Sequence, residues 1–220
     1  MLYRYLVISL LLFSALALAD SDPDQAGGPY EILKYETPDG AILVEANVDW
    51  SAYTKVQLTR GTVGFRENWI RDQRNLNSSV IRESDLERVK TEMADLLEKV
   101  LIRNLAERDS YALTSESGAD VLRFTPNIVN LDIYTPDFLR DFVGHELTDA
   151  QGSMVIVLDI HDSVSGKLLA SAVQKLQDAQ SGYFESTSRG THKTAFRRMM
   201  ERWSSWFFAM MEKVRSGDLD

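Results

Sequence analysis

The chain of 220 residues contains no cysteine and only three histidines. The absence of cysteine excludes disulfide bonds, thiolate-bound zinc or iron–sulfur sites, and lipid attachment through a cysteine. The scarcity of histidine leaves few side chains that could act as a general base or hold a metal. The sequence therefore offers little material for a catalytic or metal centre.

Common catalytic motifs are absent or incomplete. There is no G-x-S-x-G nucleophile elbow, and Gly166-Lys167 is followed by Leu168 where a phosphate-binding loop needs Ser or Thr. His145-Glu146 begins half of an H-E-x-x-H zinc helix, but Asp149 stands in the place of the second histidine. From these motifs we assign no catalytic residue, no cofactor and no metal site, and we favour a protein that is not an enzyme.

Basic residues are in the minority, since 24 Lys and Arg face 33 Asp and Glu, for a formal net charge of −9. An acidic surface repels phosphate backbones, so we expect no nucleic-acid partner.

Long apolar runs are missing except at the N-terminus, where the segment has the form of a cleavable secretory signal peptide. Arg4 provides the positive start, residues 6–16 are apolar apart from two serines, and Ala17-Leu18-Ala19 provides the small residues that signal peptidase requires. The run is shorter than the roughly 20 residues that span a bilayer. We predict a signal peptide over residues 1–19, cleavage after Ala19, no integral membrane segment in the mature protein, and release into the periplasm without lipidation.

The mature chain divides into a leader and one domain. Residues 20–30 are acidic and contain Gly27-Gly28-Pro29, which predicts a flexible leader that buries no core. Residues 31–216 are enough for a single domain with a core.

Two long amphipathic helices are predicted in this domain. The first spans residues 85–108, with Ser84 as its N-cap and Glu87 completing a capping box. The second spans residues 191–215 and ends at Gly217. In both, apolar residues recur at three- and four-residue steps, which indicates one face packed on a core.

Strand patterns occupy much of the remaining chain. We predict strands at 41–48, 53–59, 111–114 and 119–134, and a β-hairpin of strands 154–160 and 168–172 with its turn at 162–166. Residues 61–77, 135–151 and 178–190 are interpreted as loops or connections. Pro126 interrupts the fourth strand and predicts a bulge there or an edge position. The expected fold is α+β, an antiparallel-rich sheet with a C-terminal β-hairpin and the two helices packed on one face.

Three of these segments together resemble a known family. Residues 152–159 followed by Asp162-Ser163-Val164-Ser165-Gly166-Lys167-Leu168-Leu169-Ala170 resemble the strand and D-S-x-[ST]-G-x-[LV]-L-A turn of the family named domain of unknown function 3313. Residues 50–56 look like its opening strand, and residues 120–124 like the strand after its first helix. The resemblance implies a bacterial envelope protein, in a family whose members are mostly regarded as lipoproteins and have no assigned activity. This chain departs from them because it lacks the lipidated cysteine.

Three residues are candidates for a site. Asp159 and His161 are two positions apart on one strand, so they share a face and could contribute to a metal site or raise the pKa of the histidine. The alternative is that both side chains are ordinary solvated residues near the end of the hairpin, without a functional role. Phe208 lies off the apolar stripe of the last helix, so we expect it to be exposed or to cover a second contact, which makes it a candidate for partner binding.

Three functions remain open. The favoured one is a non-enzymatic binding or assembly module of the bacterial cell envelope, with an envelope protein or a second copy of the chain as partner. The second is a periplasmic metal-dependent or hydrolytic enzyme that uses Asp159 and His161. The third is a peripheral membrane protein that uses the C-terminal helix, where a face rich in aromatic residues and methionine stands opposite basic residues.

Overall fold

The structure is a computed structural model, and it describes residues 32–37, 39–77, 81–133, 146–148, 152–177, 185–187 and 189–217. The predicted signal peptide, the predicted leader and most of the predicted connections 135–151 and 178–190 lie outside these residues. Within the described part, no helix is both long and apolar enough to cross a membrane.

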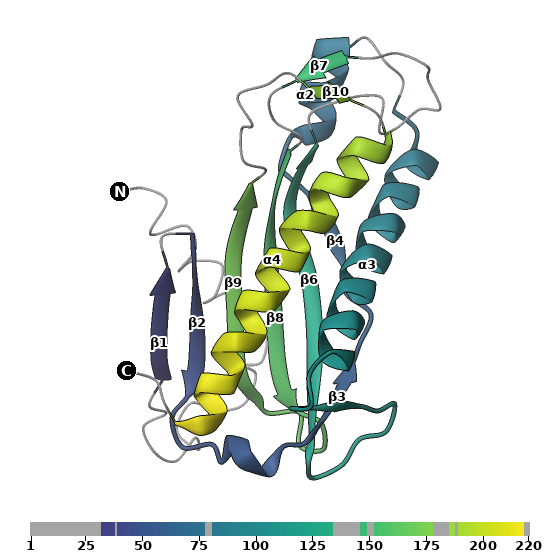
Figure 1. Ribbon diagram of the computed structural model, residues 1–220. Coiled ribbons are helices and arrows are strands. Elements are labelled where there is room, and N and C mark those ends of the chain that lie inside the picture. The colour runs from purple at the N-terminus through teal and green to yellow at the C-terminus, as the bar shows by residue number, and fades with distance from the viewer. Residues whose placement is uncertain are drawn as a thin grey trace, which may run out of the picture.

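The described residues form an α+β fold with one large sheet (Figure 1). The first part of the chain provides β1 (Ile32–Thr37), β2 (Gly40–Glu45), η1 (Trp50–Ala52), β3 (Lys55–Leu58), β4 (Val63–Phe65), α2 (Trp69–Asn77) and α3 (Glu83–Ala106). The second part provides β5 (Ala112–Leu113), β6 (Val121–Ile133), β8 (Gly152–Asp162), β9 (Leu168–Gln177) and α4 (Arg189–Ser216). A separate small sheet pairs β7 (Glu146–Thr148) with β10 (Glu185–Thr187).

The large sheet is mixed, so the prediction of an antiparallel-rich sheet is wrong. Its order is β1-β2-β9-β8-β6-β3-β5, and β4 also pairs with β6. The strands from β1 to β6 along this order pair antiparallel, whereas β3 and β4 pair parallel with β6, and β3 pairs parallel with β5. The physical reason is the helical crossover: α3 carries the chain from β3 and β4 back to the start of β5 and β6, which makes those strands parallel.

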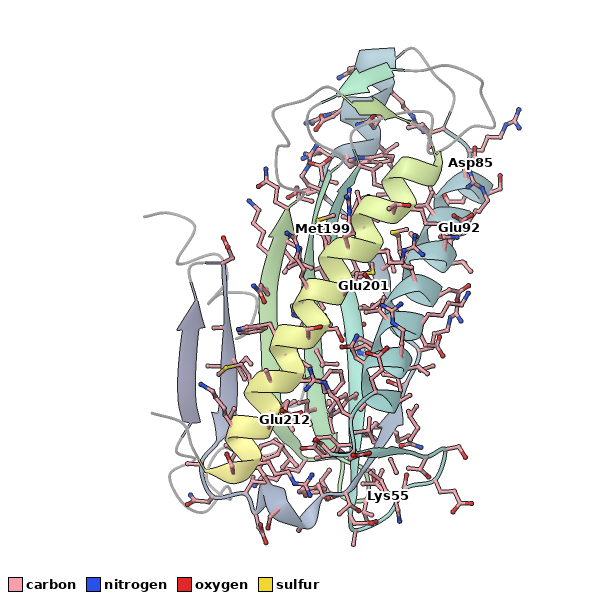
Figure 2. The ribbon with its side chains drawn as sticks, in the orientation of Figure 1. Lys55, Asp85, Glu92, Met199, Glu201 and Glu212 are labelled. Atoms are coloured by element: carbon pink, nitrogen blue, oxygen red, sulfur yellow. The ribbon has the colours of Figure 1, made fainter. Side chains whose placement is uncertain are left out.

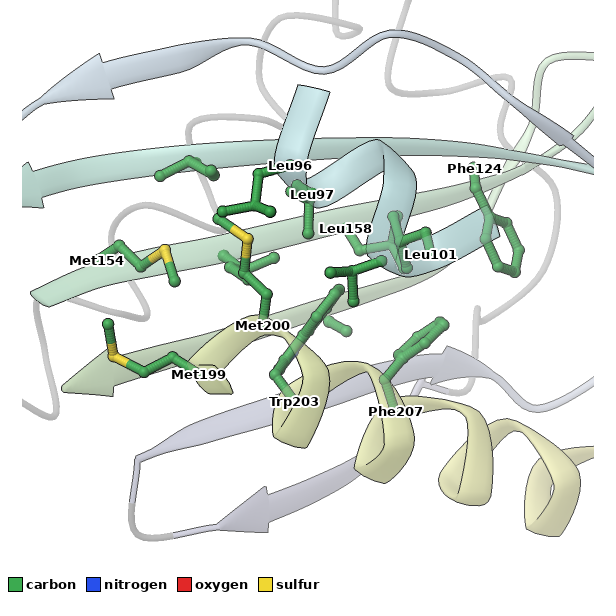
Figure 3. Close-up of a cluster of buried hydrophobic side chains, with 14 of the residues drawn as sticks. Leu96, Leu97, Leu101, Phe124, Met154, Leu158, Met199, Met200, Trp203 and Phe207 are labelled. Carbon is green, nitrogen blue, oxygen red and sulfur yellow. The ribbon is translucent and has the colours of Figure 1, made fainter. Parts of the chain in front are cut away.

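Helices α3 and α4 lie on the same face of the sheet, as the sequence predicts, and the core lies between them and the strands (Figure 1). On β8, Met154 and Leu158 face the helices and are fully buried. Figure 3 shows them packed against side chains of α3, such as Leu101, and of α4, such as Met200 and Trp203. Alternate residues of the hairpin strands thus meet two helical stripes.

Phe208 is 1% exposed and belongs to this core. Its ring stacks on Phe124 of β6 at 6.4 Å between centroids, and the Arg108 guanidinium carbon lies 5.7 Å from the ring centroid. Helix α4 packs on both the sheet and α3, so a position away from its main stripe is buried as well. Of the two alternatives predicted for Phe208, the structure shows the second contact, and the side chain is not available as an anchor for a partner.

The predicted end of α4 agrees with the structure, whereas the predicted start of α3 does not. Gly217 has a φ of 72° and directly follows α4, which confirms the predicted end. Helix α3 begins earlier than predicted, with Arg82 as its N-cap and no hydrogen bond from a side chain. The predicted capping box on Ser84 is therefore wrong, because Ser84 already lies within the first turn.

Pro126 lies where a backbone donor is not needed. Strand β3 ends opposite Phe124, and β4 begins opposite Ile128, so Pro126 faces the link between these two strands. On its other side β6 pairs through Pro126 with β8 without interruption. The predicted bulge occurs later, between Val129 and Asp132, where Asn130 has a φ of 53°. The prediction of a bulge is confirmed, but its position at the proline is wrong.

The link between β3 and β4 generates a test of this arrangement. A Cβ added at Gly61 would lie 1.8 Å from the Pro126 carbonyl oxygen, whereas nothing lies within 4 Å of a Cβ added at Gly64. We expect Gly61→Ala to lower the free energy of unfolding by about 1–3 kcal/mol, because the backbone must move away from β6. The matched control Gly64→Ala should be at least as stable as the native chain. Urea denaturation followed by circular dichroism measures both, and equal stability of the two variants would contradict the close approach.

Candidate functional site

A cleft of about 640 Å³ lies between β4, α2 and the first turns of α3. Its apolar lining comes from Val63, Phe65, Trp69, Ile70 and Leu86, and its charged lining from Arg66, Arg71, Arg74, Lys90 and Glu83. The strand forms one wall of the cleft and the two helices form the other walls. This combination of an apolar surface with several cations gives the cleft the character of a ligand site.

Two stacked rings form the fixed part of this lining. Trp69 is 1% exposed, and its indole N–H donates to the Ile133 carbonyl oxygen at 3.1 Å. The Phe65 ring stacks on it at 4.6 Å between centroids and 21° between planes. Asn68, with a φ of 63°, supplies the left-handed residue between the end of β4 and the start of α2. The rings are therefore positioned by the backbone before any ligand arrives.

Arg66 ties the elements around the cleft together. Its Nε donates to Asp132 of β6 at 2.7 Å, and one terminal nitrogen donates to Asp72 of α2 at 3.1 Å. The hydrogen bond to Asp132, followed by that to Asp72, raises the pKa of the Arg66 guanidinium above its usual range. Its charge is thus used within the protein, so we interpret Arg66 as a positioning residue for β4 and α2.

The other cations are engaged by fewer acidic partners than Arg66. Arg71 contacts Asp72 at 3.5 Å with a side chain that is 67% exposed, and Lys90 pairs with Glu87 at 2.6 Å. Arg74 is exposed and forms no ion pair with any residue that the structure describes. Arg71 and Arg74 can therefore turn toward an anionic group in the cleft at little electrostatic cost.

Sequence reasoning missed this site because it interpreted residues 61–77 as a loop. The segment contains β4 and α2, and it is stabilised by burial of Trp69 and Gln73, one helical turn apart. The i, i+4 spacing of those two residues was a weak helix signal. The buried position of Trp69 depends on a hydrogen bond to the distant Ile133, which no local pattern reveals.

Asp159 and His161 lie on the sheet face opposite the helices, as predicted. The Asp159 carboxylate accepts a hydrogen bond from the Ser171 hydroxyl at 2.6 Å. His161 is half-buried, and it pairs across the strands with Arg123. Among the residues that the structure describes, its Nδ1 has no hydrogen-bond partner. Burial, helped by Arg123, lowers the pKa of His161 below its ordinary value and outweighs the opposite effect of Asp159. The expectation that Asp159 raises the pKa of His161 above that value is therefore wrong.

A metal site at these two residues would need further ligands. Among the residues that the structure describes, no group of three or more His, Asp or Glu side chains could hold a metal ion. His145, Glu146 and Asp149, the incomplete zinc motif, fall where side chains are outside the described part.

The hairpin motif that carries the family resemblance is a turn with internal hydrogen bonds. The Asp162 carboxylate accepts from the Ser165 backbone N–H at 2.6 Å and from its hydroxyl at 2.7 Å, and these bonds lower the pKa of Asp162. Gly166 follows with a φ of 72°. The Tyr53 hydroxyl donates to Asp162 at 3.0 Å, and burial together with this bond raises the pKa of Tyr53 to about 12. The motif therefore shapes the turn and joins it to the start of β3.

Comparison with known proteins agrees with this structural motif. A family model described as protein of unknown function (DUF3313) matches residues 22–205, which include the turn, the cleft and most of the core. The chain belongs to this family. The resemblance seen in the sequence is confirmed, and no curated protein matches the chain.

Solved structures include distant likenesses at TM-scores below 0.5. PelC from Paraburkholderia phytofirmans, solved as a dodecamer, has 8% identity and a TM-score of 0.37, over 74% of this chain and 93% of its own. Protein XCC0632 from Xanthomonas campestris has 10% identity and a TM-score of 0.44, over 75% and 89%. A candidate lipoprotein from Caulobacter crescentus CB15 has 10% identity and a TM-score of 0.35, over 78% and 96%.

The environment of His161 predicts a pH dependence of stability. Its pKa in the folded protein lies below the ordinary value of 6.5, so the unfolded chain takes up the proton first as the pH falls. Stability is therefore fully present above about pH 6.5 and decreases below it, by at most about 1.4 kcal/mol per pH unit. We expect His161→Gln to flatten this decrease, as measured by urea denaturation between pH 7 and pH 5. Arg123→Gln should flatten it partly, and an unchanged slope in His161→Gln would contradict the assignment.

Proposed function

We propose that the protein is a non-enzymatic binding module of the bacterial cell envelope, and that the cleft between β4, α2 and α3 is its ligand site. The observation that carries this proposal is the stacked Phe65–Trp69 pair, held in the lining of a cleft that also has exposed cations. Because the side chains of such a site are already ordered, binding does not cost the free energy of ordering them, and the affinity is higher.

The size and lining of the cleft fit a small ligand. Ligand pockets in proteins have volumes of about 300–1,000 Å³ and combine an apolar lining with a few polar groups. The cleft has a volume of about 640 Å³ and follows this pattern, with Arg71 and Arg74 as the polar groups least engaged by other residues. Arg66 is held by Asp72 and Asp132, so we interpret it as a residue that positions the walls of the cleft and does not bind the ligand.

The envelope location is the second part of the proposal. Membership of the DUF3313 family and the N-terminal signal pattern support an exported protein. We propose cleavage after Ala19 and release into the periplasm without lipid, because the chain has no cysteine to carry one.

Export gives a direct prediction. Expressed in a Gram-negative host, the protein should be recovered from the periplasmic fraction with a mass that begins at Asp20 and carries no lipid. Ala17→Arg with Ala19→Arg removes the small residues before the cleavage site and should leave the unprocessed chain in the membrane fraction. Intact mass spectrometry separates these products, and a native chain that retains residues 1–19 would contradict the prediction.

The ligand site can be tested by removing its two least engaged cations. Arg71→Gln with Arg74→Gln removes two positive charges from the lining of the cleft, and Gly64→Ala, whose added Cβ meets nothing within 4 Å, is the matched control. We expect native mass spectrometry of protein purified from the periplasm to show a non-covalent adduct on the native chain and on Gly64→Ala. The adduct should be lost from the double variant Arg71→Gln with Arg74→Gln.

Thermal unfolding provides the second readout of the same test. An organic extract of the envelope should raise the unfolding temperature of the native chain and of Gly64→Ala, but not that of the double variant Arg71→Gln with Arg74→Gln. An adduct of equal mass on all three proteins would place the ligand elsewhere. No adduct and no thermal shift on the native chain would sink the proposal of a binding module that uses this cleft.

A further inference from the structure

Exposed positions of α4 carry five cations that have no ion-pair partner among the residues that the structure describes. We call this set the basic ridge, and it consists of Lys193, Arg197, Arg198, Arg202 and Lys213. All five side chains are exposed, and none forms an ion pair with any residue that the structure describes. The closest polar contact within this set is from Arg197 to the Thr194 hydroxyl, at 3.4 Å.

The acids of α4 do not neutralise the basic ridge, because they are used on the side that faces α3. Glu201 pairs with Arg103, and Glu212 pairs with Arg108 at 2.6 Å. Figure 2 shows Glu201 and Glu212 on α4. These pairs connect α4 to α3 and to the residues just after it, whereas the five cations of the basic ridge have no acidic partner among the described residues.

Helix α3 shows the opposite arrangement. Its Arg88 contacts Asp85 and Glu92, and Lys90 pairs with Glu87, all within one helical turn. Arg88 and Lys90 of α3 are thus compensated within their own helix, whereas the cations of the basic ridge form no ion pair with any described residue. In a chain with a formal net charge of −9, this segregation makes the outer side of α4 an unusual positive surface.

The structure also changes what the C-terminal helix can offer to a membrane. Its aromatic stripe, including Phe196, Trp203 and Phe207, is buried in the core and cannot insert into lipid. Trp206 and Met210 are half-buried, pack against the edge of the core and remain partly exposed. An indole of this kind is suited to the polar headgroup region of a bilayer.

We propose that the basic ridge docks the protein reversibly on a surface of anionic phospholipid, by charge attraction without insertion of the helix. Each basic residue near such a surface increases the partition constant about fivefold, so five residues suffice for measurable binding. The attraction acts over a Debye length, about 8 Å at physiological salt, and salt therefore weakens it. The basic ridge and the cleft lie on different elements, so this proposal and the proposed ligand site can fail independently.

Vesicle flotation tests the proposal with purified full-length mature protein. The protein should float with vesicles of phosphatidylglycerol and phosphatidylethanolamine at low salt, and stay behind with vesicles of phosphatidylcholine. Raising the salt concentration should release it from the anionic vesicles. Addition of a random DNA duplex is a competing arm, because phosphate backbones are also anionic.

Charge reversal locates the contact. Arg198→Glu with Arg202→Glu should reduce binding to anionic vesicles by at least tenfold. The matched control is Arg82→Glu with Lys99→Glu, two exposed cations of α3 and its N-cap, which gives the same net charge and should keep native binding. Because all four side chains are exposed, we expect both variants to fold, and circular dichroism checks this.

Three results would overturn the proposal. The first is a native chain that does not float with anionic vesicles at low salt. The second is equal binding by the ridge variant and the native chain, or equal loss in the control, which would show an effect of net charge alone. The third is binding to DNA without binding to vesicles, which would assign the basic ridge to a different anionic partner.

Discussion

The packing of α4 against both the sheet and α3 is the interaction on which the rest of the structure depends. Trp203 and Phe207 stack at 5.5 Å between centroids (Figure 3). Phe207 and Phe208 both contact Phe124 of β6. Burial of each large apolar side chain stabilises the fold by about 1.5–3 kcal/mol. Because these aromatic residues face inward, the charged residues of α4 are divided between the contact with α3 and the solvent. Packing of the core thus determines which residues of α4 are exposed and available to bind a partner.

Strand β6 organises the other half of the molecule. It pairs antiparallel with β8 and parallel with β3 and β4, so it connects the hairpin to the segment that builds the cleft. Its C-terminal end provides two fixed points, the Ile133 carbonyl that holds Trp69 and the Asp132 carboxylate that holds Arg66. The bulge just before these residues sets their direction. A strand in the middle of the sheet therefore positions a site at its end.

The two surfaces that we assign to binding differ in physical character. The cleft has fixed aromatic rings and a pair of loosely held guanidinium groups, which suits a single small ligand with an apolar part. The basic ridge is a row of exposed charges without a pocket, which suits an extended anionic surface. Neither depends on Asp159 and His161, since Asp159 is held by Ser171 and burial lowers the pKa of His161.

The sequence by itself determined the family, both long helices, the end of α4 at Gly217 and the hairpin, because each of these depends on residues that are close together in the chain. The turn of the hairpin forms through contacts among Asp162, Ser165 and Gly166, which lie within five residues of one another, so the local sequence is enough to predict it. Only the tertiary structure decided the parallel pairing of β3 and β4, the burial of Phe208 and the existence of α2. Each of these depends on a partner about 60 or more residues away, such as Leu122 for Val56, Phe124 for Phe208 and Ile133 for Trp69. The spacing of apolar residues along an element shows which of its sides is apolar. Burial of a second side, and the direction of neighbouring strands, depend on how the elements pack together.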